Sequence, residues 1–470
     1  MIDASTRWWA FATLCIGNLM IVLDMSVVNV ALPSIKSDLL FSDASLVWVV
    51  NAYLLTFGGF LLLGGRLGDL YGQRRLFLTG LSVFTLASLA CGLASTQEML
   101  IIARTIQGIG GAMASAIAFS LVINIFPDPR ERARAMGVFG FIMAGGGSVG
   151  VLLGGLLTVI NWHLNFLINI PIGIGVFIAC LYLLPKMPGV SHGERLDFSG
   201  AVTVTASLLL AIYAIIGGNE VGWGSFQTLG LLLGAIVLFG IFLWIESRVS
   251  HPLVPLDIFK NRNLAISSVV GVFWAAAMFA WFFLAALYLQ LILQYGPQEV
   301  GLAFLPANLI MAAFSIGLSA WVVMKFGIRA PIGVGLVLAA AGLLLFARAP
   351  IDGSFWVDVF PSMLLLGLGA GMAFNPVLLA AMGDVPQQET GLASGVVNTA
   401  FMMGGSLGLA ILAAIAAAVT IGAGGAGAGT LALNSGYQAA FFAGAIFAAL
   451  AALLGAFALR EPKHAPQAMH

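Results

Sequence analysis

Charged residues are scarce in this sequence. Of its 470 residues, 19 are lysine or arginine and 19 are aspartate or glutamate, so charged residues make up 8% of the chain and the formal net charge is zero. Soluble domains carry about 25% charged residues, and a water-soluble fold of this length could not cover its surface with so few. The shortage of charge predicts that lipid is the solvent, and the absence of a positive excess argues against a nucleic-acid partner.

Cysteines and enzyme motifs are also few. The three cysteines, Cys15, Cys91 and Cys180, lie in apolar stretches, which is typical of buried thiols rather than of disulfides or metal ligands. We find no glycine-rich loop followed by lysine, no HExxH motif, no nucleophile elbow and no dinucleotide fingerprint. We therefore expect no enzymatic activity, no metal and no cofactor.

Apolar runs, in contrast, fill the chain. Hydrophobic residues make up 61% of the sequence, and each run is long enough to cross a hydrocarbon core of about 30 Å as a helix. The first run contains an aspartate and is too long for a cleavable signal peptide. We predict an all-α integral membrane protein whose fourteen spans are residues 8–32, 46–66, 76–95, 98–124, 135–159, 164–184, 198–218, 228–246, 264–293, 300–323, 331–348, 356–381, 391–420 and 437–459.

Lysine and arginine indicate the orientation of these spans. With both termini in the cytoplasm, the predicted inner segments hold sixteen of these residues, and the outer segments hold only Lys36 and Arg348. Short cytoplasmic loops of membrane proteins are enriched in these two residue types. The bias predicts a multi-pass protein of the plasma membrane (the inner membrane of a bacterium) with both termini on the cytoplasmic side.

Two parts of the chain resemble each other. The pattern Gly-x-Gly-x-x-Met-Ala occurs at 108–114 and at 367–373, and Gly-Gly-Ser-x-Gly occurs at 146–150 and at 404–408, with offsets of 259 and 258 residues. Spans 1–6 thus match spans 9–14 in the same orientation. Parallel halves of this kind have their binding site near the bilayer midplane, between the halves. We predict an N-terminal six-helix half at 1–190, two inserted helices and a linker at 191–262, and a C-terminal six-helix half at 263–470.

Asp24 and Arg104 are the clearest charged residues inside predicted spans. Placing either in hydrocarbon costs at least about 2.5–3.5 kcal/mol, so each must face a partner or a cavity. A carboxyl group in such surroundings can carry a proton, because its neighbours decide whether it is ionised. We interpret Asp24 as a proton carrier and Arg104 as a residue of proton coupling. The alternatives are an aspartate bonded to a neighbouring helix and an arginine that reaches the outer interface or ties spans together.

The turn after the second span combines glycines with charges, at Gly65, Asp69, Gly72, Arg74 and Arg75. Glycines permit a tight turn, and the aspartate and arginines can pair with one another or with helix ends. We predict that this turn is a cytoplasmic gate that latches the inner side of the two halves. The alternative is that its arginines only set the topology.

A ridge of glycines runs along the fifth span. Its members are Gly146, Gly150 and Gly154, extended by Gly155. Small residues at this spacing are typical of close helix contact in membranes. We expect a packing role, and a sliding or sealing surface in a moving bundle is the alternative.

Aromatic residues recur every seven positions in the ninth span, at Trp274, Trp281 and Tyr288, with Met278 between them. This spacing keeps them on roughly one face of a helix. That face is expected to border the substrate cavity, where aromatic rings bind flat or cationic molecules, although ordinary bundle packing is an equal alternative. The other residues predicted for the cavity are Asn29, Gln107, Asn308 and Asn398.

Four segments carry a resemblance to a known family. They are Leu23–Pro33 (LDMSVVNVALP), Gly65–Gly72 (GRLGDLYG), Ala103–Ala112 (ARTIQGIGGA) and Phe166–Gly173 (FLINIPIG). Together they resemble, over essentially the whole chain, the fourteen-helix drug:proton antiporter family of the major facilitator superfamily. The resemblance implies the major facilitator fold and proton-driven export of hydrophobic or cationic drugs, including antibiotics. It also implies a role in proton coupling for Asp24 and Arg104 and a place in the cytoplasmic gate for Asp69.

Two positions depart from the pattern of that family. Val151 stands where the glycine motif of the fifth span usually has proline, and His163 stands where arginine usually precedes the sixth span. These replacements bear on the kinetics of antiport and leave the predicted family and topology unchanged.

The expected protein is a secondary active transporter that works by alternating access as a monomer. Its expected partners are an amphipathic small-molecule substrate, protons and membrane lipids. The nearest alternative is an exporter or flippase-like transporter of lipid or of a lipid-like metabolite. A membrane scaffold or sensor without transport is a third hypothesis, against which the presence of Asp24, Arg104 and Asp69 argues.

Overall fold

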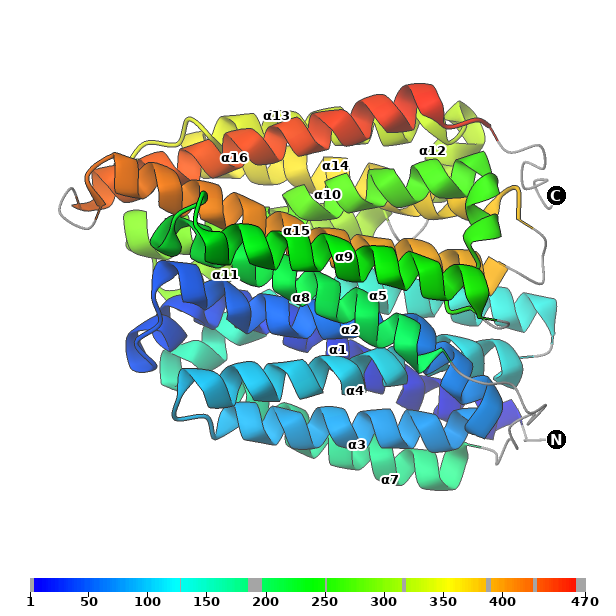
Figure 1. Ribbon diagram of the computed structural model, residues 1–470. Coiled ribbons are helices and arrows are strands. Elements are labelled where there is room, and N and C mark those ends of the chain that lie inside the picture. The colour runs from blue at the N-terminus through cyan, green and yellow to red at the C-terminus, as the bar shows by residue number, and fades with distance from the viewer. Residues whose placement is uncertain are drawn as a thin grey trace. The chain divides into compact units, whose positions relative to one another are not determined.

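The protein is helical throughout the part of the chain that the computed structural model describes (Figure 1). The first seven helices are α1 (Ala4–Asp38), α2 (Asp43–Tyr71), α3 (Gln73–Gly92), α4 (Gln97–Ile125), α5 (Pro129–Ile160), α6 (Leu164–Leu167) and α7 (Asn169–Leu183). The described residues are 4–126, 128–184, 197–249, 252–314, 318–385, 390–425 and 429–461.

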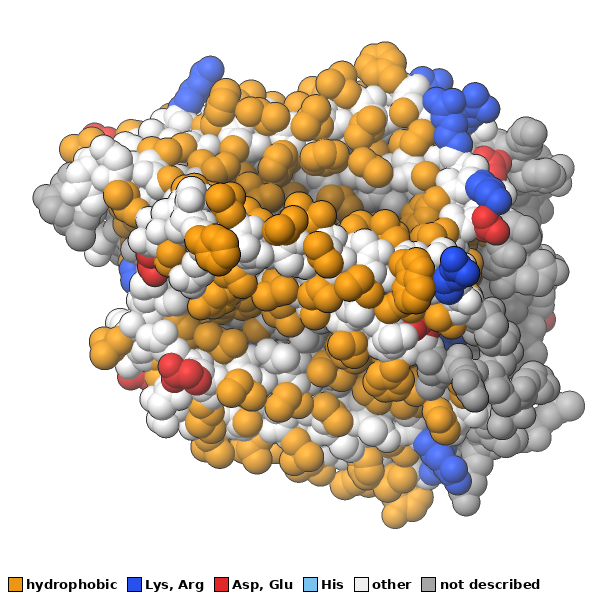
Figure 2. Space-filling model, in the orientation of Figure 1, with side chains coloured by type: hydrophobic (Ala, Val, Ile, Leu, Met, Phe, Trp, Pro, Cys, Tyr) orange, Lys and Arg blue, Asp and Glu red, His pale blue; other side chains and the backbone are white. Residues whose placement is uncertain are grey.

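The second part of the chain is also helical. Its helices are α8 (Phe198–Val221), α9 (Phe226–Arg248), η1 (Leu256–Lys260), α10 (Arg262–Leu287), η2 (Tyr288–Ile292), α11 (Pro297–Ala313), α12 (Ser319–Phe326), α13 (Arg329–Phe346), η4 (Phe355–Val359), α14 (Phe360–Met382), α15 (Thr390–Gly422), α16 (Gly429–Leu453) and η7 (Leu454–Ala458). Along these helices, apolar side chains cover the middle and charged side chains lie near the ends (Figure 2). Lipid is the solvent that such surfaces require.

Twelve helices in the described residues are long and apolar enough to cross a membrane. They confirm a multi-span membrane protein. Of the two other predicted spans, 135–159 falls on α5, in which Val149–Ile160 is a shorter apolar helix. The span 300–323 falls on α11 and α12, on either side of residues 315–317, which lie outside the described part. The count of fourteen therefore stays a prediction.

Two predicted spans have different ends in the structure. The first span was predicted to end at residue 32, but α1 continues through Pro33 to Asp38. The sixth is divided at Ile168 into α6 and α7. Pro171 has no N–H to offer the carbonyl of Leu167, four residues before it, and this missing hydrogen bond explains the break.

The chain folds into two compact units. The first comprises Met1–Thr205 with the short segments Arg248–Leu253 and Gly296–Leu302, and the second comprises Ala206–Ser247, Val254–Tyr295 and Ala303–His470. The predicted boundaries at residues 190 and 262 stay a prediction.

Glycines of α4 bring three helices of the first unit together. A Cβ atom on Gly108 would lie 2.5 Å from the carbonyl oxygen of Tyr53 on α2, and one on Gly110 would lie 2.5 Å from the backbone nitrogen of Phe84 on α3. Any larger side chain would separate these helices. The close approach places Arg104, one turn before Gly108, deep between its neighbours.

The repeated glycines of the second unit make equivalent contacts. A Cβ atom on Gly367 of α14 would lie 2.6 Å from the carbonyl oxygen of Ala307 on α11, and one on Gly369 would lie 2.5 Å from that of Gly335 on α13. The pattern shared by α4 and α14 is therefore a packing device, with one glycine facing each of two neighbouring helices.

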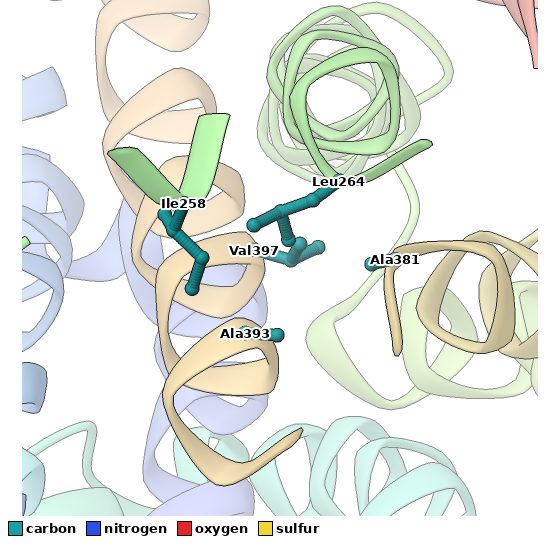
Figure 3. Close-up of a cluster of buried hydrophobic side chains, with 5 residues drawn as sticks. All are labelled: Ile258, Leu264, Ala381, Ala393 and Val397. Atoms are coloured by element: carbon teal, nitrogen blue, oxygen red, sulfur yellow. The ribbon is translucent and has the colours of Figure 1, made fainter. Parts of the chain in front are cut away.

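A small cluster of buried apolar side chains lies where η1, α10, α14 and α15 meet (Figure 3). Ile258 of η1, Leu264 of α10, Ala381 of α14 and the pair Ala393 and Val397 of α15 form it, and all five are buried. The cluster fixes the start of α10, the helix that carries the aromatic repeat.

Gly146, Gly150 and Gly154 of the α5 ridge lie against α1. A Cβ atom on Gly154 would lie 2.8 Å from the Cα atom of Val27, whereas one on Gly147 would meet nothing within 4 Å. A Cβ atom on Gly146 would be 2.8 Å from the Leu19 side chain, and one on Gly155 would be 2.7 Å from the Pro297 carbonyl oxygen. Gly150 also faces α1, at the Ser26 side chain and the carbonyl oxygen of Leu23.

We expect Gly154→Ala to lower the free energy of unfolding by about 1–3 kcal/mol, because the new methyl group forces α1 and α5 apart. Gly147→Ala is the matched control. It adds the same methyl group to open space in the same helix and should be neutral or stabilising by about 0.5–1 kcal/mol. Thermal unfolding of both variants in detergent measures the difference, and equal melting temperatures would show that the ridge is not a tight contact.

Candidate functional site

An ion pair is buried inside the first unit. Asp24 lies in the middle of α1 and Arg104 lies in α4, and their side chains are 0% and 1% exposed. The Nη1 atom of Arg104 is 2.5 Å from Oδ2 of Asp24. Either charge alone would be costly at this depth, so each requires the other.

Two amide side chains complete the shell of the Asp24 carboxylate. Nε2 of Gln107 donates to its Oδ1 atom at 2.8 Å, and Nδ2 of Asn169 donates to the same atom at 3.0 Å. Nη1 of Arg104 also donates to Oε1 of Gln107 at 2.8 Å. Asp24 therefore accepts hydrogen bonds from three side chains on α4 and α7.

The arginine is held from the other side by α2. Its Nε atom donates to the carbonyl oxygen of Val49 at 3.0 Å, and its guanidinium carbon lies 4.3 Å from the ring centre of Tyr53. The ring centre of Phe166 is 5.7 Å away. A planar cation stacked on an aromatic ring and anchored to a carbonyl has a fixed orientation.

A second layer of hydrogen bonds ties this shell to α3 and α6. Nδ2 of Asn169 also donates to Oγ of Ser88 at 2.9 Å, and that hydroxyl donates to the carbonyl oxygen of Phe166 at 2.9 Å. Sγ of Cys91 lies 3.6 Å from Oε1 of Gln107. The carboxylate is thus connected to five further helices of its unit, α2, α3, α4, α6 and α7.

This arrangement makes the proton and the ion pair compete. All three side chains that face the Asp24 oxygens are donors, whereas a protonated carboxyl group brings a hydrogen of its own that needs an acceptor. Protonation would remove the negative charge that attracts Arg104 and would weaken the hydrogen bonds from Arg104, Gln107 and Asn169. Because these residues lie on two other helices, the protonation state of one carboxyl group is linked to the packing of α1, α4 and α7.

The structure brings together some of the residues predicted from the sequence. Asp24 and Arg104 are direct partners. Gln107, predicted for the substrate cavity, lies fully buried in the contacts of this pair. Asn29 donates to the carbonyl oxygen of Met25 in its own helix, and Asn398 donates to that of Ser394.

Several residues of this shell have no predicted role. Asn169 belongs to a motif segment without a role of its own, and Ser88, Tyr53 and the Val49 carbonyl belong to none of the predicted sites. A polar side chain inside an apolar run marks Asn169 and Ser88 as candidates. The sequence gives no sign of the contact with the Val49 carbonyl, because every residue has a backbone carbonyl group.

The predicted cytoplasmic gate is a turn between α2 and α3. Gly72 has φ +95°, a conformation that favours glycine, and Gly65 has open space around it. Arg74 donates to the carbonyl oxygen of Leu181 at the end of α7, and Arg75 is exposed. The side chain of Asp69 lies outside the described part of the chain.

The second unit repeats this turn. Gly327 has φ +73°, and Arg329 donates through Nη2 to the carbonyl oxygen of Ala456 at 2.6 Å. Two backbone N–H groups at the start of α13, those of Ile328 and Arg329, donate to the carboxylate of Glu461 at 3.1 and 3.3 Å. In each unit, therefore, an arginine after a glycine turn donates to a backbone carbonyl near the end of another helix, α7 in the first unit and η7 in the second.

The aromatic repeat of α10 and η2 is buried. Trp274, Trp281 and Tyr288 are 2%, 1% and 1% exposed, and Met278 is partly buried. The Tyr288 hydroxyl donates to the carbonyl oxygen of Pro350 at 2.8 Å. Trp281 lies against Phe304 of α11, with ring centres 5.6 Å apart, and Asn308 follows one turn later on α11.

Comparison with known proteins identifies the family. Residues 14–409 match the family model described as Major Facilitator Superfamily. The puromycin resistance protein of Streptomyces alboniger is 37% identical over 417 residues, which cover 88% of this chain and 82% of that protein. The cephamycin export protein of Amycolatopsis lactamdurans is 34% identical over 454 residues, which cover 96% and 92%.

Solved structures agree on the fold. The nucleoside transporter NupG superposes with a TM-score of 0.66 at 12% identity, covering 96% of this chain and 98% of that one. A bacterial homologue of the human lysosomal transporter Spinster has a TM-score of 0.66 at 16% identity, with 97% and 98% covered. The resemblance to drug:proton antiporters, with resistance and export proteins as relatives, is confirmed. The chain belongs to the Major Facilitator Superfamily and is a multi-span membrane transporter.

Proposed function

We propose that this transporter exports amphipathic small molecules from the cell in exchange for protons. The observation that carries the proposal is the Asp24 carboxylate, fully buried and surrounded by three donors on α4 and α7. The names of the relatives support the direction of transport and the class of cargo, since they are antibiotic resistance and export proteins. In this proposal the chain has fourteen spans and keeps both termini in the cytoplasm.

The proposed exchange uses the competition between proton and ion pair. A proton that arrives from outside neutralises Asp24 and releases Arg104 or one of the amides from it. The released groups allow α1 and α4 to repack, and this repacking accompanies the change of access. Release of the proton inside restores the ion pair, and the ionised form binds the next substrate.

The energy available is sufficient for concentrative export. Moving one proton across 100 mV supplies about 2.3 kcal/mol. That amount sustains roughly a fiftyfold gradient of an uncharged substrate for each proton. One carboxyl group that alternates between two protonation states is enough to couple the two movements.

The exchange is tested with purified protein in liposomes that contain a pH-sensitive dye and have an acidic interior. Addition of ethidium or of a neutral hydroxyanthraquinone should produce proton efflux that depends on both substrate and protein. Substrate that equilibrates without proton movement would contradict coupling. Movement of labelled phospholipid between leaflets, with neither probe transported, would favour the lipid transporter instead.

A second prediction concerns the turn between α2 and α3, which we propose as the cytoplasmic gate. Asp69→Asn should reduce the transport rate at least severalfold, because it removes a negative charge beside a turn that carries Arg74 and Arg75. Its melting temperature should stay within a few degrees of the unaltered protein, since the residue lies near the end of α2. Transport at the unaltered rate would leave the turn as a topology signal only.

A further inference from the structure

One face of α10 carries three buried hydrogen-bond donors without an acceptor. Ser267, Trp274 and Trp281 are spaced by seven residues, which keeps them on one side of the helix. All three are at most 2% exposed. Within the described residues, neither the Ser267 hydroxyl nor either indole N–H has a hydrogen-bond partner.

A fourth such donor lies on the neighbouring helix. The amide nitrogen of Asn308 in α11 is buried and has no partner among the described residues. It lies one turn beyond Phe304, whose ring centre is 5.6 Å from that of Trp281. Two unpaired donors and two aromatic rings are therefore gathered where α10 meets α11.

These donors are exceptional because buried polar groups are nearly always paired. The donors around Asp24 in the first unit show the usual situation, since Arg104, Gln107 and Asn169 all donate to it. Tyr288, the next position of the repeat, is also satisfied by the carbonyl oxygen of Pro350. Within the repeat, the residues with unpaired donors thus precede Tyr288 in the chain, and a ligand that accepts hydrogen bonds would satisfy these donors.

The lack of charged residues on the surrounding helices limits the chemical class of the ligand further. Beyond Arg262, α10 has no charged residue, and α14, α15 and α16 have none at all. On α11 the charged residue is Glu299 in the first turn, about two and a half turns before Asn308. A cation would find no carboxylate in α10, α14, α15 or α16 and would meet the positive ends of N–H groups. An anion would find no basic side chain there.

We propose that the second unit binds the substrate through Trp274, Trp281 and Asn308, and that this subsite takes uncharged, flat molecules with carbonyl or ether oxygens. The inference rests on the proposed function, since it names the substrate class of the same transporter. Indole N–H groups donate to the oxygens while aromatic rings cover the flat surface. A neutral cargo also leaves the charge chemistry to Asp24 and Arg104 in the other unit.

The test compares two probes by equilibrium binding to the purified full-length protein in detergent. The first is a neutral hydroxyanthraquinone, which is flat and rich in carbonyl oxygen, and the second is tetraphenylphosphonium, an aromatic cation without an acceptor. Trp274→Phe and Trp281→Phe keep an aromatic ring and remove the N–H. Each should raise the Kd of the quinone about five- to tenfold and change that of the cation less than twofold.

Trp244→Phe is the matched control, because Trp244 is an exposed tryptophan of α9 in the same unit. It should leave both Kd values unchanged. Equal losses for both probes, or tighter binding of the cation by the unaltered protein, would overturn the proposal. If a tryptophan variant does not fold, Asn308→Ala removes a donor from another helix and should show the same selective loss.

This experiment separates the subsite from the proposed proton exchange. Binding in detergent needs no gradient. If the tryptophan variants selectively lose quinone binding while the unaltered protein moves no protons in liposomes, only the proposed exchange is contradicted. Proton movement with no difference between the probes would contradict the subsite alone.

Discussion

Asp24→Asn is expected to abolish transport against a gradient while substrate still equilibrates across the membrane. Asparagine resembles the protonated carboxyl group in shape and charge but cannot release a proton. Its oxygen can still accept from Arg104, and Arg104 keeps its bonds to Val49 and Gln107. The variant should therefore fold and bind substrate with the weaker affinity of the protonated form, and accumulation driven by a pH gradient should fall at least tenfold.

Binding measured against pH gives the same variant a second readout. In the proposed exchange the ionised form binds substrate, so affinity of the unaltered protein should rise as pH rises. Asp24→Asn should show a flat profile. Asp257→Asn is the matched control, because it makes the same chemical change at a carboxylate that is 84% exposed, and it should pump normally. A variant at Asp24 that still accumulates substrate would show that the coupling proton travels elsewhere.

Arg104→Met is expected to destabilise the protein by about 3–5 kcal/mol, because it leaves the buried Asp24 carboxylate without its cation. Methionine fills much of the same space, so the loss of charge rather than of volume dominates. Thermal and chemical unfolding in detergent measure this loss. Expression and melting temperature should fall together.

The double variant Asp24→Asn with Arg104→Met decides whether the two charges act as a pair. Removing both should be less damaging than the sum of the single losses, by at least about 1 kcal/mol. Strict additivity would mean that the two side chains contribute to stability independently. Arg104→Lys offers a further comparison, because it keeps the charge but loses the planar group stacked on Tyr53.

The membrane fold is largely predictable from the sequence, because apolar runs of sufficient length have few alternatives to helices in lipid. Helix ends are less predictable. The apolar run marks the thickness of the hydrocarbon rather than the end of the helix, so α1 extends past Pro33 to Asp38. The break at Ile168 depends on one missing N–H at Pro171, which is hidden inside an otherwise continuous apolar run.

The candidate site is predictable in part. Asp24 and Arg104 stand out because a charged residue is costly to bury inside an apolar run and is therefore expected to have a partner or a function. Their neighbours are less visible, since Asn169 is 145 residues from Asp24 in the chain and reaches it only through the packing of α1 and α7. Gln107 is predicted to line the substrate cavity, and only the folded chain shows it bonded to the ion pair.

The spacing of the aromatic repeat does not determine the hydrogen bonds that its side chains make. The sequence places Trp274, Trp281 and Tyr288 on one face and treats them alike. The structure separates them, because the Tyr288 hydroxyl has an acceptor and the two indole N–H groups have none among the described residues. That difference depends on the position of the Pro350 carbonyl, which no pattern in the sequence encodes.

Proton release on substrate binding tests the central claim most directly. Purified protein is mixed with saturating substrate in weakly buffered detergent solution, and the protons released are counted with a pH indicator. We predict up to one proton released per molecule of the unaltered protein, according to the starting pH, and none from Asp24→Asn at the same substrate occupancy. Equal release from both proteins would contradict the assignment of Asp24 as the proton carrier.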